Sequence, residues 1–219
     1  KEDAAFADLR RTFKAAKRAE GKDHLRMKIG NTVQKIVDVH QIPGNPKADF
    51  SLINDKGEHV YHISHKDGSL PKHHQGFATS HSDVSDTDTF KNFIQNVAQK
   101  VGNRPNGLLG QTVAARLDNS NKEHREIIKR SVWGKDHASK KTGINNVDVV
   151  HQGRMTLKKK NGLYEIHSTH EIHRGQEFNH EYQMHVRRAA DRALPGTRIK
   201  GRFFVHHVGG RDYEHEVDA

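Results

Sequence analysis

Two short runs of strand-forming residues, joined by a four-residue turn, place the strongest constraint on the fold of this chain. The runs are Phe50–Ile53 and Val60–Ile63, and the turn between them is Asn54–Gly57. Aromatic and β-branched residues favour strands, and a glycine in such a turn can take the positive φ angle that a tight reversal requires. The sequence therefore predicts a β-hairpin.

The second strand of this hairpin carries a polar row beside an apolar one. Because side chains alternate between the two faces of a strand, two rows are expected: His62, Ser64 and Lys66 on one face, and Tyr61, Ile63 and His65 on the other. A lysine that ends such a row can reach toward Asp49, at the start of the first strand. The hairpin thus brings one acid and one lysine to the same end.

The spacing of this acid and lysine resembles the PD-(D/E)XK, or restriction-endonuclease-like, nuclease superfamily. In that family an Asp on one strand and a (Glu/Asp)-x-Lys on the next bind a divalent metal and orient the attacking water. Asp49 and Lys66 match, whereas Ser64 stands where the family usually has a metal-ligating carboxylate. The resemblance implies an α/β fold with a mixed sheet flanked by helices. It also implies a Mg²⁺ or Mn²⁺ ion at Asp49 and Ser64, and hydrolysis of DNA phosphodiester bonds.

Three neighbouring segments are similar to a bacteriophage-encoded group of restriction-endonuclease-like proteins. They are Pro46–Asp49, Ile63–Gly68 and Pro71–Gly76. The resemblance adds Gln75 to the candidate catalytic residues, because some members of the superfamily place a downstream Gln near the site.

A helix is expected directly before the hairpin, from Lys28 to Val39, because Ile29, Val33 and Ile36 recur at helical spacing. In the resembling superfamily a helix in this place often donates a Glu to the metal site, and Gln34 occupies that position. An amide oxygen brings no charge, so the metal would be held more weakly than by three carboxylates. Asp67, directly after the lysine, could replace the missing acid if the strand ends early.

Two other interpretations stay open. Asp49 and Lys66 could be ordinary solvent-exposed strand ends. The histidines invite a zinc site, and they form two groups: His62, His65, His73, His74 and His81 near the hairpin, and His167, His170 and His173 further on. Zinc needs three or four ligands that converge in space. Along a strand His170 would lie on the face opposite its two neighbours, so one convergent site is not predicted.

The charge of the chain favours an acidic polymer as its partner. Thirty-seven Lys and Arg against 27 Asp and Glu leave a net charge of +10, and the resemblance makes DNA the expected polymer. Basic residues near the C-terminus, with Phe203 and Phe204 among them, are expected to contact phosphates: Arg187, Arg188, Arg192, Arg198, Lys200 and Arg202. The alternative to an enzyme is a non-catalytic DNA-binding or phage virion structural protein with a nuclease-like fold. Assembly into a homo-oligomer or a virion is compatible with either function.

Helical patterns occur at Glu2–Glu20, from a cap at Ser85-Asp86 to Val101, and from a capping box at Ser120–Glu123 to Trp133. Strand-like runs fill the last third: Val147–Val150, Arg154–Leu157, Leu163–His167 and Arg198–Val205. A hairpin turn is expected at Lys160–Gly162. The segment 181–192 is ambiguous between helix and strand. We expect a nuclease-like core in 1–101, followed in 102–219 by a helical connector and a β-rich region that can belong to one continuous domain.

The sequence contains no cysteine, and no apolar run approaches the about 18 residues that span a bilayer. We therefore expect a protein without disulfides or membrane contact. Its expected location is the cytoplasm of a native or infected bacterial cell, or the virion.

Overall fold

The computed structural model describes residues 2–68, 76–138, 143–169, 171–174, 180–208 and 215–219, and the chain divides into two compact units. Unit 1 consists of Lys1–Leu70 and Asp136–Glu177, and unit 2 of Pro71–Lys135 and Phe178–Ala219. Each unit therefore combines two separate parts of the chain. This division differs from the expected one after residue 101, because strands from 149–174 return to the sheet of unit 1.

Within its described residues, unit 1 consists of one helix, α1 (Glu2–Glu20), and a mixed sheet with the strand order β10-β7-β4-β3-β2-β1-β9-β8. The strands are β1 (Leu25–Ile29), β2 (Thr32–Gln41), β3 (Phe50–Asn54), β4 (His59–Lys66), β7 (Val149–Gln152), β8 (Met155–Lys160), β9 (Leu163–Ser168) and β10 (Glu171–Arg174). The pairs β4–β7 and β1–β9 are parallel, and the others are antiparallel. The expectation of an α/β fold with a mixed sheet is confirmed at this level.

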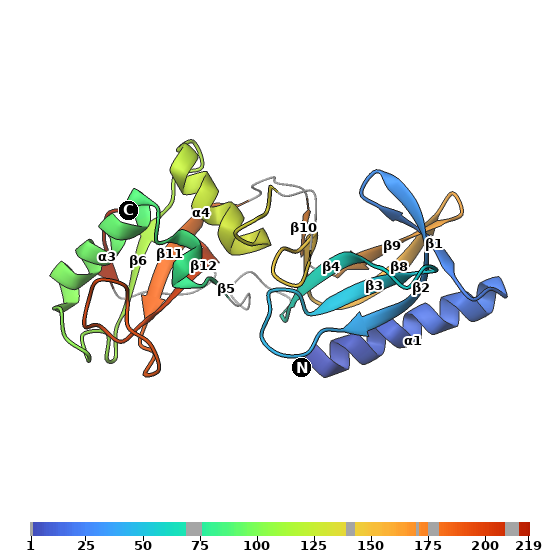
Figure 1. Ribbon diagram of the computed structural model, residues 1–219, viewed down its shortest axis with the longest axis horizontal. Coiled ribbons are helices and arrows are strands. Elements are labelled where there is room, and N and C mark those ends of the chain that lie inside the picture. Colours follow the sequence, from blue (N-terminus) through green and yellow to red (C-terminus); the bar gives the residue numbers. More distant parts are fainter. Residues whose placement is uncertain (1, 69–75, 139–142, 170, 175–179, 209–214) are drawn as a thin grey trace. The chain divides into compact units, whose positions relative to one another are not determined.

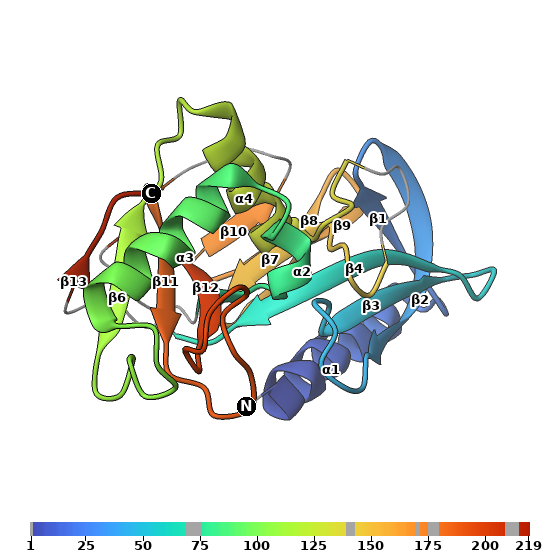
Figure 2. The same cartoon turned by 60° about the vertical axis from the view of Figure 1, so that its left-hand side comes forward.

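Helix α1 packs its apolar stripe on one face of this sheet, which we call the core face (Figure 1). Leu9 and Phe13 are fully buried, and the Phe6 ring stacks on that of Phe50 with 5.7 Å between centroids. Burying side chains of this size contributes about 1.5–3 kcal/mol each. The sequence-based prediction of this helix is confirmed, and Figure 2 shows α1 running alongside β2 and β3.

The helix expected at Lys28–Val39 is wrong, because this segment forms the hairpin β1–β2. Gly30 takes a φ of 60° in the turn, and Arg26 pairs with Lys35 across it. The apolar residues of the segment are largely β-branched, and such side chains lose rotamer freedom in a helix but pack well on a pleated surface. Helical spacing was therefore the weaker of two signals in this segment.

The two hairpins predicted from turn residues are confirmed. In the β3–β4 turn the Asn54 side chain accepts hydrogen bonds from the backbone N–H groups of Lys56 and Glu58, and Gly57 has a φ of 76°. In the β8–β9 turn Asn161 and Gly162 have φ angles of 54° and 77°. Two successive positive φ angles match the twist of the flanking strands.

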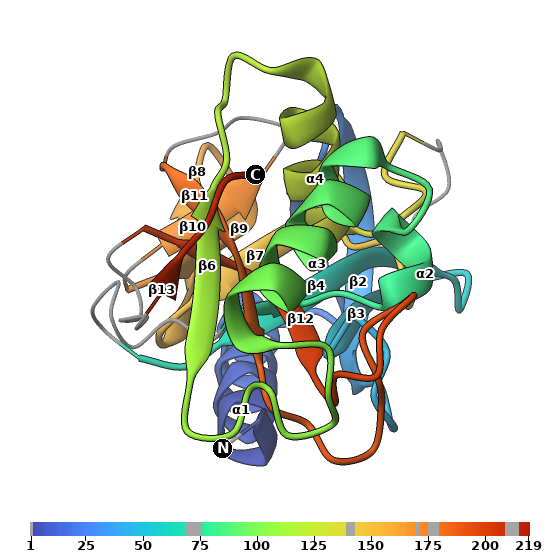
Figure 3. The same ribbon diagram turned by 90° about the vertical axis from the view of Figure 1, so that its left-hand side faces the viewer.

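Unit 2 places helices on one face of an antiparallel sheet to which one short parallel strand is added. Its helices are α2 (His81–Val84), α3 (Asp88–Val101) and α4 (Lys122–Trp133). Its strands, in the order β13-β6-β11-β12-β5, are β5 (Phe77–Ala78), β6 (Thr112–Arg116), β11 (Tyr182–Arg187), β12 (Arg202–His207) and β13 (His215–Glu216). Figure 3 shows α3 lying across the sheet, where Phe90 and Phe93 contact the Phe203 ring at 5.1 and 6.3 Å.

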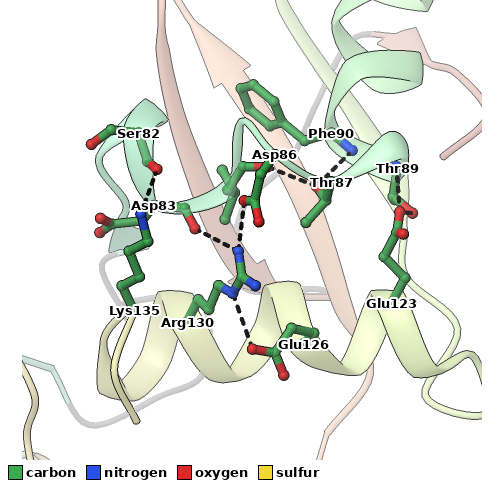
Figure 4. A network of polar contacts seen from close by, with 11 residues as sticks. Ser82, Asp83, Asp86, Thr87, Thr89, Phe90, Glu123, Glu126, Arg130 and Lys135 are labelled. Carbon is green, nitrogen blue, oxygen red and sulfur yellow. Dashed lines mark hydrogen bonds and ion pairs between the residues drawn. The ribbon is translucent and has the colours of Figure 1, made fainter.

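The helices expected to end at Val101 and Trp133 are confirmed, but their caps differ. Thr87 caps α3 by accepting a hydrogen bond from the Phe90 N–H at 3.2 Å, and Asn121 caps α4. The expected capping box at Ser120–Glu123 is wrong, because the Glu123 carboxylate accepts from the N–H and the hydroxyl of Thr89, each at 2.5 Å (Figure 4). Glu123 thus links α4 to the start of α3.

The ambiguous segment 181–192 contains strand β11, and the run Arg198–Val205 contributes the first part of β12. Among the described residues, no helix is long and apolar enough to cross a membrane.

Candidate functional site

Asp49 lies at the open end of the β3–β4 hairpin, beside Ser64. Its backbone N–H donates to the carbonyl of Ile63 at 2.8 Å, and its Oδ2 accepts from the N–H of His65 at 2.6 Å. The partners of these two bonds flank Ser64 in the chain. Asp49 therefore holds the strand end together through one carboxylate oxygen, in addition to any chemical role.

Ser64 and Lys66 lie on the face of the sheet opposite the core face, which we call the outer face. Ile63, which precedes Ser64 in β4, is fully buried in the core under α1. Side chains alternate along a strand, so His62, Ser64 and Lys66 point to the opposite face. Ser64 is buried and Lys66 is half-buried. The expected polar row on β4 is confirmed, and it ends beside Asp49.

On the other side of β4, strand β7 supplies a residue that the sequence analysis missed. Lys66 is paired with Gln152 in the parallel β4–β7 ladder, and the Lys66 carbonyl accepts from the N–H of Gly153 at 2.9 Å. Gln152 is fully buried, and its amide nitrogen donates to the Asp67 carbonyl at 3.4 Å. Its only signal in the sequence was a polar residue two positions after the strand-like run Val147–Val150.

The side chains at this place offer the oxygen ligands that a hard divalent cation prefers, but they carry too little negative charge for tight binding. Mg²⁺ prefers oxygen ligands, and Asp49, Ser64 and Gln152 carry a carboxylate, a hydroxyl and an amide. Among the described residues no group of three or more His, Cys, Asp or Glu could hold a metal ion. Any ion at this place would therefore meet one full negative charge from Asp49.

Gln34 does not join Asp49, contrary to the sequence-based expectation. It lies on β2, opposite Met27, and its Oε1 accepts from the Asn54 amide at 3.5 Å, at the turn end of the hairpin. Asn54 is four residues from Phe50, or about 13 Å along the strand. The assignment failed together with the helix that was expected to present Gln34. Gln75 lies outside the described residues.

A cluster of polar side chains continues along the outer face of β2, β3 and β4. The Ser51 hydroxyl and His59 Nδ1 are 2.6 Å apart, and the His40 ring meets that of His59 edge-on at 5.1 Å. Burial lowers the pKa of His59, and the charges of His40 and His62 lower it further. This part of the face thus favours the neutral form of His59.

The structure does not bring together a zinc-type set among the described histidines of the hairpin. His65 lies on the core face, where its Nε2 is 2.8 Å from the Gly153 carbonyl and its ring faces Phe50. His62 lies on the outer face, with its N–H donating to Asp148 Oδ2 at 2.8 Å. His81 belongs to unit 2. His73, His74 and His170 lie outside the described residues, and so does the side chain of His173.

Of the six basic residues expected to bind nucleic acid, the structure brings two together. Arg187 and Arg202 are paired across β11 and β12, and their guanidinium groups lie 4.4 and 5.2 Å from the centre of the Phe204 ring. Arg192 pairs with Asp191 at 3.0 Å. Burial lowers the pKa of His81, and the charges of Arg192 and Arg202 both lower it further. Of the others, Arg188 directly follows Arg187 at the end of β11, and Arg198 and Lys200 precede β12.

Comparisons of the chain with protein-family models, curated proteins and solved structures gave no match.

Proposed function

We propose that this protein is a divalent-metal-dependent DNA endonuclease or nicking enzyme of the restriction-endonuclease-like type, encoded by a bacteriophage. One observation carries the proposal: Asp49 lies beside Ser64 at the end of two adjacent strands, with Lys66 two residues further on the same face. The net charge of +10 supports an acidic polymer as the substrate.

Each residue has a chemical role in this proposal. Asp49 would hold a Mg²⁺ or Mn²⁺ ion, together with the Ser64 hydroxyl. A bound cation supplies charge neutralisation at the phosphate and a more acidic water. Lys66 places a positive charge beside the scissile phosphate, where it stabilises the negative charge that develops in the transition state. Gln152, on the neighbouring strand, orients the end of β4 through the Asp67 carbonyl.

A non-catalytic DNA-binding protein, or a virion structural protein, is the second candidate. It is favoured by the neutral side chains of Ser64 and Gln152, which give a metal ion no charge beyond that of Asp49. It is also favoured by the hydrogen bond from His65 to Asp49, which is a sufficient structural reason for an acid at this position.

Cleavage of supercoiled plasmid DNA with Mg²⁺ or Mn²⁺, and with EDTA as a blank, separates the two candidates. Lys66→Ala is expected to abolish cleavage without changing the unfolding midpoint. Lys56→Ala removes an exposed lysine at the other end of the same hairpin and is expected to cleave like the wild type. Cleavage by a pure Lys66→Ala preparation would refute the assignment. A wild type that binds DNA but cuts at no metal concentration would establish the second candidate.

A further inference from the structure

Five basic side chains from three separate parts of the chain lie on the outer face of unit 1. We call them the outer cationic face: Arg26, Lys28, Lys35, Lys158 and Lys160. Arg26 and Lys35 are register partners in the β1–β2 hairpin, and Lys28 is two residues from Arg26. Lys158 and Lys160 lie on β8, two residues apart. Figure 1 shows the two hairpins, β1–β2 and β8–β9, next to each other.

The pairing of the strands places all five side chains on the same side of the sheet. Met27 and Tyr164 are partners in the parallel β1–β9 pair, and Met27 is buried in the core. Residues directly before and after them in these strands therefore point to the outer face. Glu165 is one of these residues, and its partner on β8 is Lys158.

The five cations are exposed and unpaired. In the described part of the chain, none of their side chains takes part in a hydrogen bond or ion pair, and all five are exposed. Cations beside the core face behave differently: Arg10 pairs with Asp38, Arg11 and Arg154 with Asp8, and Lys159 with Glu20. Four basic residues around α1 thus have carboxylate partners, whereas the five of the outer face form no ion pair with a described residue, although Asp148 and Glu165 line a pocket together with Lys28.

Like charges on adjacent strands repel one another, so this arrangement costs stability unless an anion binds to it. Four strands, from β2 to β8, span about 14 Å at the usual spacing. A duplex of that length presents about eight phosphates. No helix among the described residues of unit 1 lies on this face, so an extended polyanion can reach it.

We infer that the outer cationic face binds the phosphate backbone of duplex DNA. The inference rests on the DNA-binding part of the proposed function, and it adds a contact surface in unit 1 to the expected one around Arg187. Lysine and arginine contacts to phosphates position a duplex without reading its sequence. Ser64 and Lys66, on strand β4 of the same sheet, also point away from the core.

Binding of a fluorescent 24-base-pair duplex, measured in EDTA at several salt concentrations, tests the inference without requiring cleavage. The variant Lys28→Gln/Lys35→Gln/Lys158→Gln removes three cations from the face. Its matched control, Lys56→Gln/Lys91→Gln/Lys122→Gln, removes three exposed lysines from elsewhere and leaves the same net charge.

Each phosphate contact contributes about 0.9 to the log–log salt slope, so the face variant is expected to flatten the slope by roughly two to three units. At 0.1 M salt its affinity should fall on the order of a hundredfold. The control should keep the wild-type slope to within about half a unit. Equal slopes for the two triple variants, or no binding by the wild type at low salt, would overturn the inference.

The unfolding midpoint of each variant is compared with that of the wild type to check that the variant is folded. The double variant Lys158→Gln/Lys160→Gln, at the end of the β8–β9 hairpin, repeats the binding test with fewer substitutions in the sheet. Failure of the enzyme proposal has a different signature: the wild type binds DNA but does not cut it, while the face variant still loses affinity.

Discussion

Asp49 can be tested for a structural and a chemical role separately, because the two roles need different properties of its side chain. The strand-end bond needs an oxygen that accepts from the His65 N–H, which lies 2.6 Å away. Metal binding needs the negative charge. Asp49→Asn keeps the acceptor and removes the charge, whereas Asp49→Ala removes both.

The expected magnitudes follow from the surroundings of this bond. His65 is buried and Asp49 is half-buried, and hydrogen bonds to charged groups contribute about 1.5–3 kcal/mol. We therefore expect Asp49→Ala to lower the free energy of unfolding by about 2 kcal/mol. For a chain of this length that corresponds to about 4–8 °C in the unfolding midpoint. Asp49→Asn should lose less than half of this, since a neutral acceptor still meets the N–H.

Thermal unfolding followed by circular dichroism measures the first role, and metal-dependent plasmid cleavage measures the second. Asp55→Ala is the matched control, because Asp55 is exposed at the turn end of the same hairpin. We expect Asn to be nearly as stable as the wild type and inactive. If Asp49→Asn is as destabilised as Asp49→Ala, the hydrogen bond from His65 is not what Asp49 contributes to the stability of the fold. If Asn cleaves DNA normally, Asp49 does not hold the metal.

Two further predictions concern the other side chains of the outer face. Ser64→Glu should lower the magnesium concentration for half-maximal cleavage by about tenfold or more, because it adds a charged ligand beside Asp49, whereas Gln34→Glu at the far end should leave it unchanged; equal effects would refute the geometry. Burial, with the charges of His40 and His62, lowers the pKa of His59. As the pH is lowered below about 6.5, the unfolded chain therefore binds the proton more readily than the folded one, and the free energy of unfolding decreases. Urea unfolding at pH 7.5 and 5.5 should show a smaller loss for His59→Gln than for the wild type, and an equal loss would exclude His59 as the source.

The local elements of this fold could be predicted because their signals lie within a few residues. The turns at Asn54–Gly57 and Asn161-Gly162 indicate their hairpins, because they contain residues that accept a positive φ. The apolar stripe of α3 announces a helix through its spacing. In each case the physical cause is a backbone angle or a period of burial, and residues close together in the sequence determine it.

The segment Lys28–Val39 shows where local signals conflict. Its apolar residues satisfy a helical period, but Gly30 and Asn31 turn the chain back on itself and the β-branched side chains pack on a pleated surface. The decisive contribution is tertiary, since Ile36 and Val39 are buried in the core that α1 covers. The pattern of residues within the segment gives no information about that contact. Because the helix prediction was wrong, Gln34 was assigned to a site from which it is distant.

The same argument explains why Gln152 and the outer cationic face could not be predicted from the sequence. Gln152 reaches Lys66 through the parallel β4–β7 pair, and Lys158 reaches Lys28 through the parallel β1–β9 pair. Parallel neighbours require long connections, so residues more than 80 positions apart in the sequence become neighbours without any local mark. In the sequence the basic residues are scattered, and only the strand register shows that Arg26, Lys28, Lys35, Lys158 and Lys160 share one face. A surface of this kind is therefore a property of the strand order, and any substitution that shifts the β1–β9 register should disperse it even if every lysine is retained.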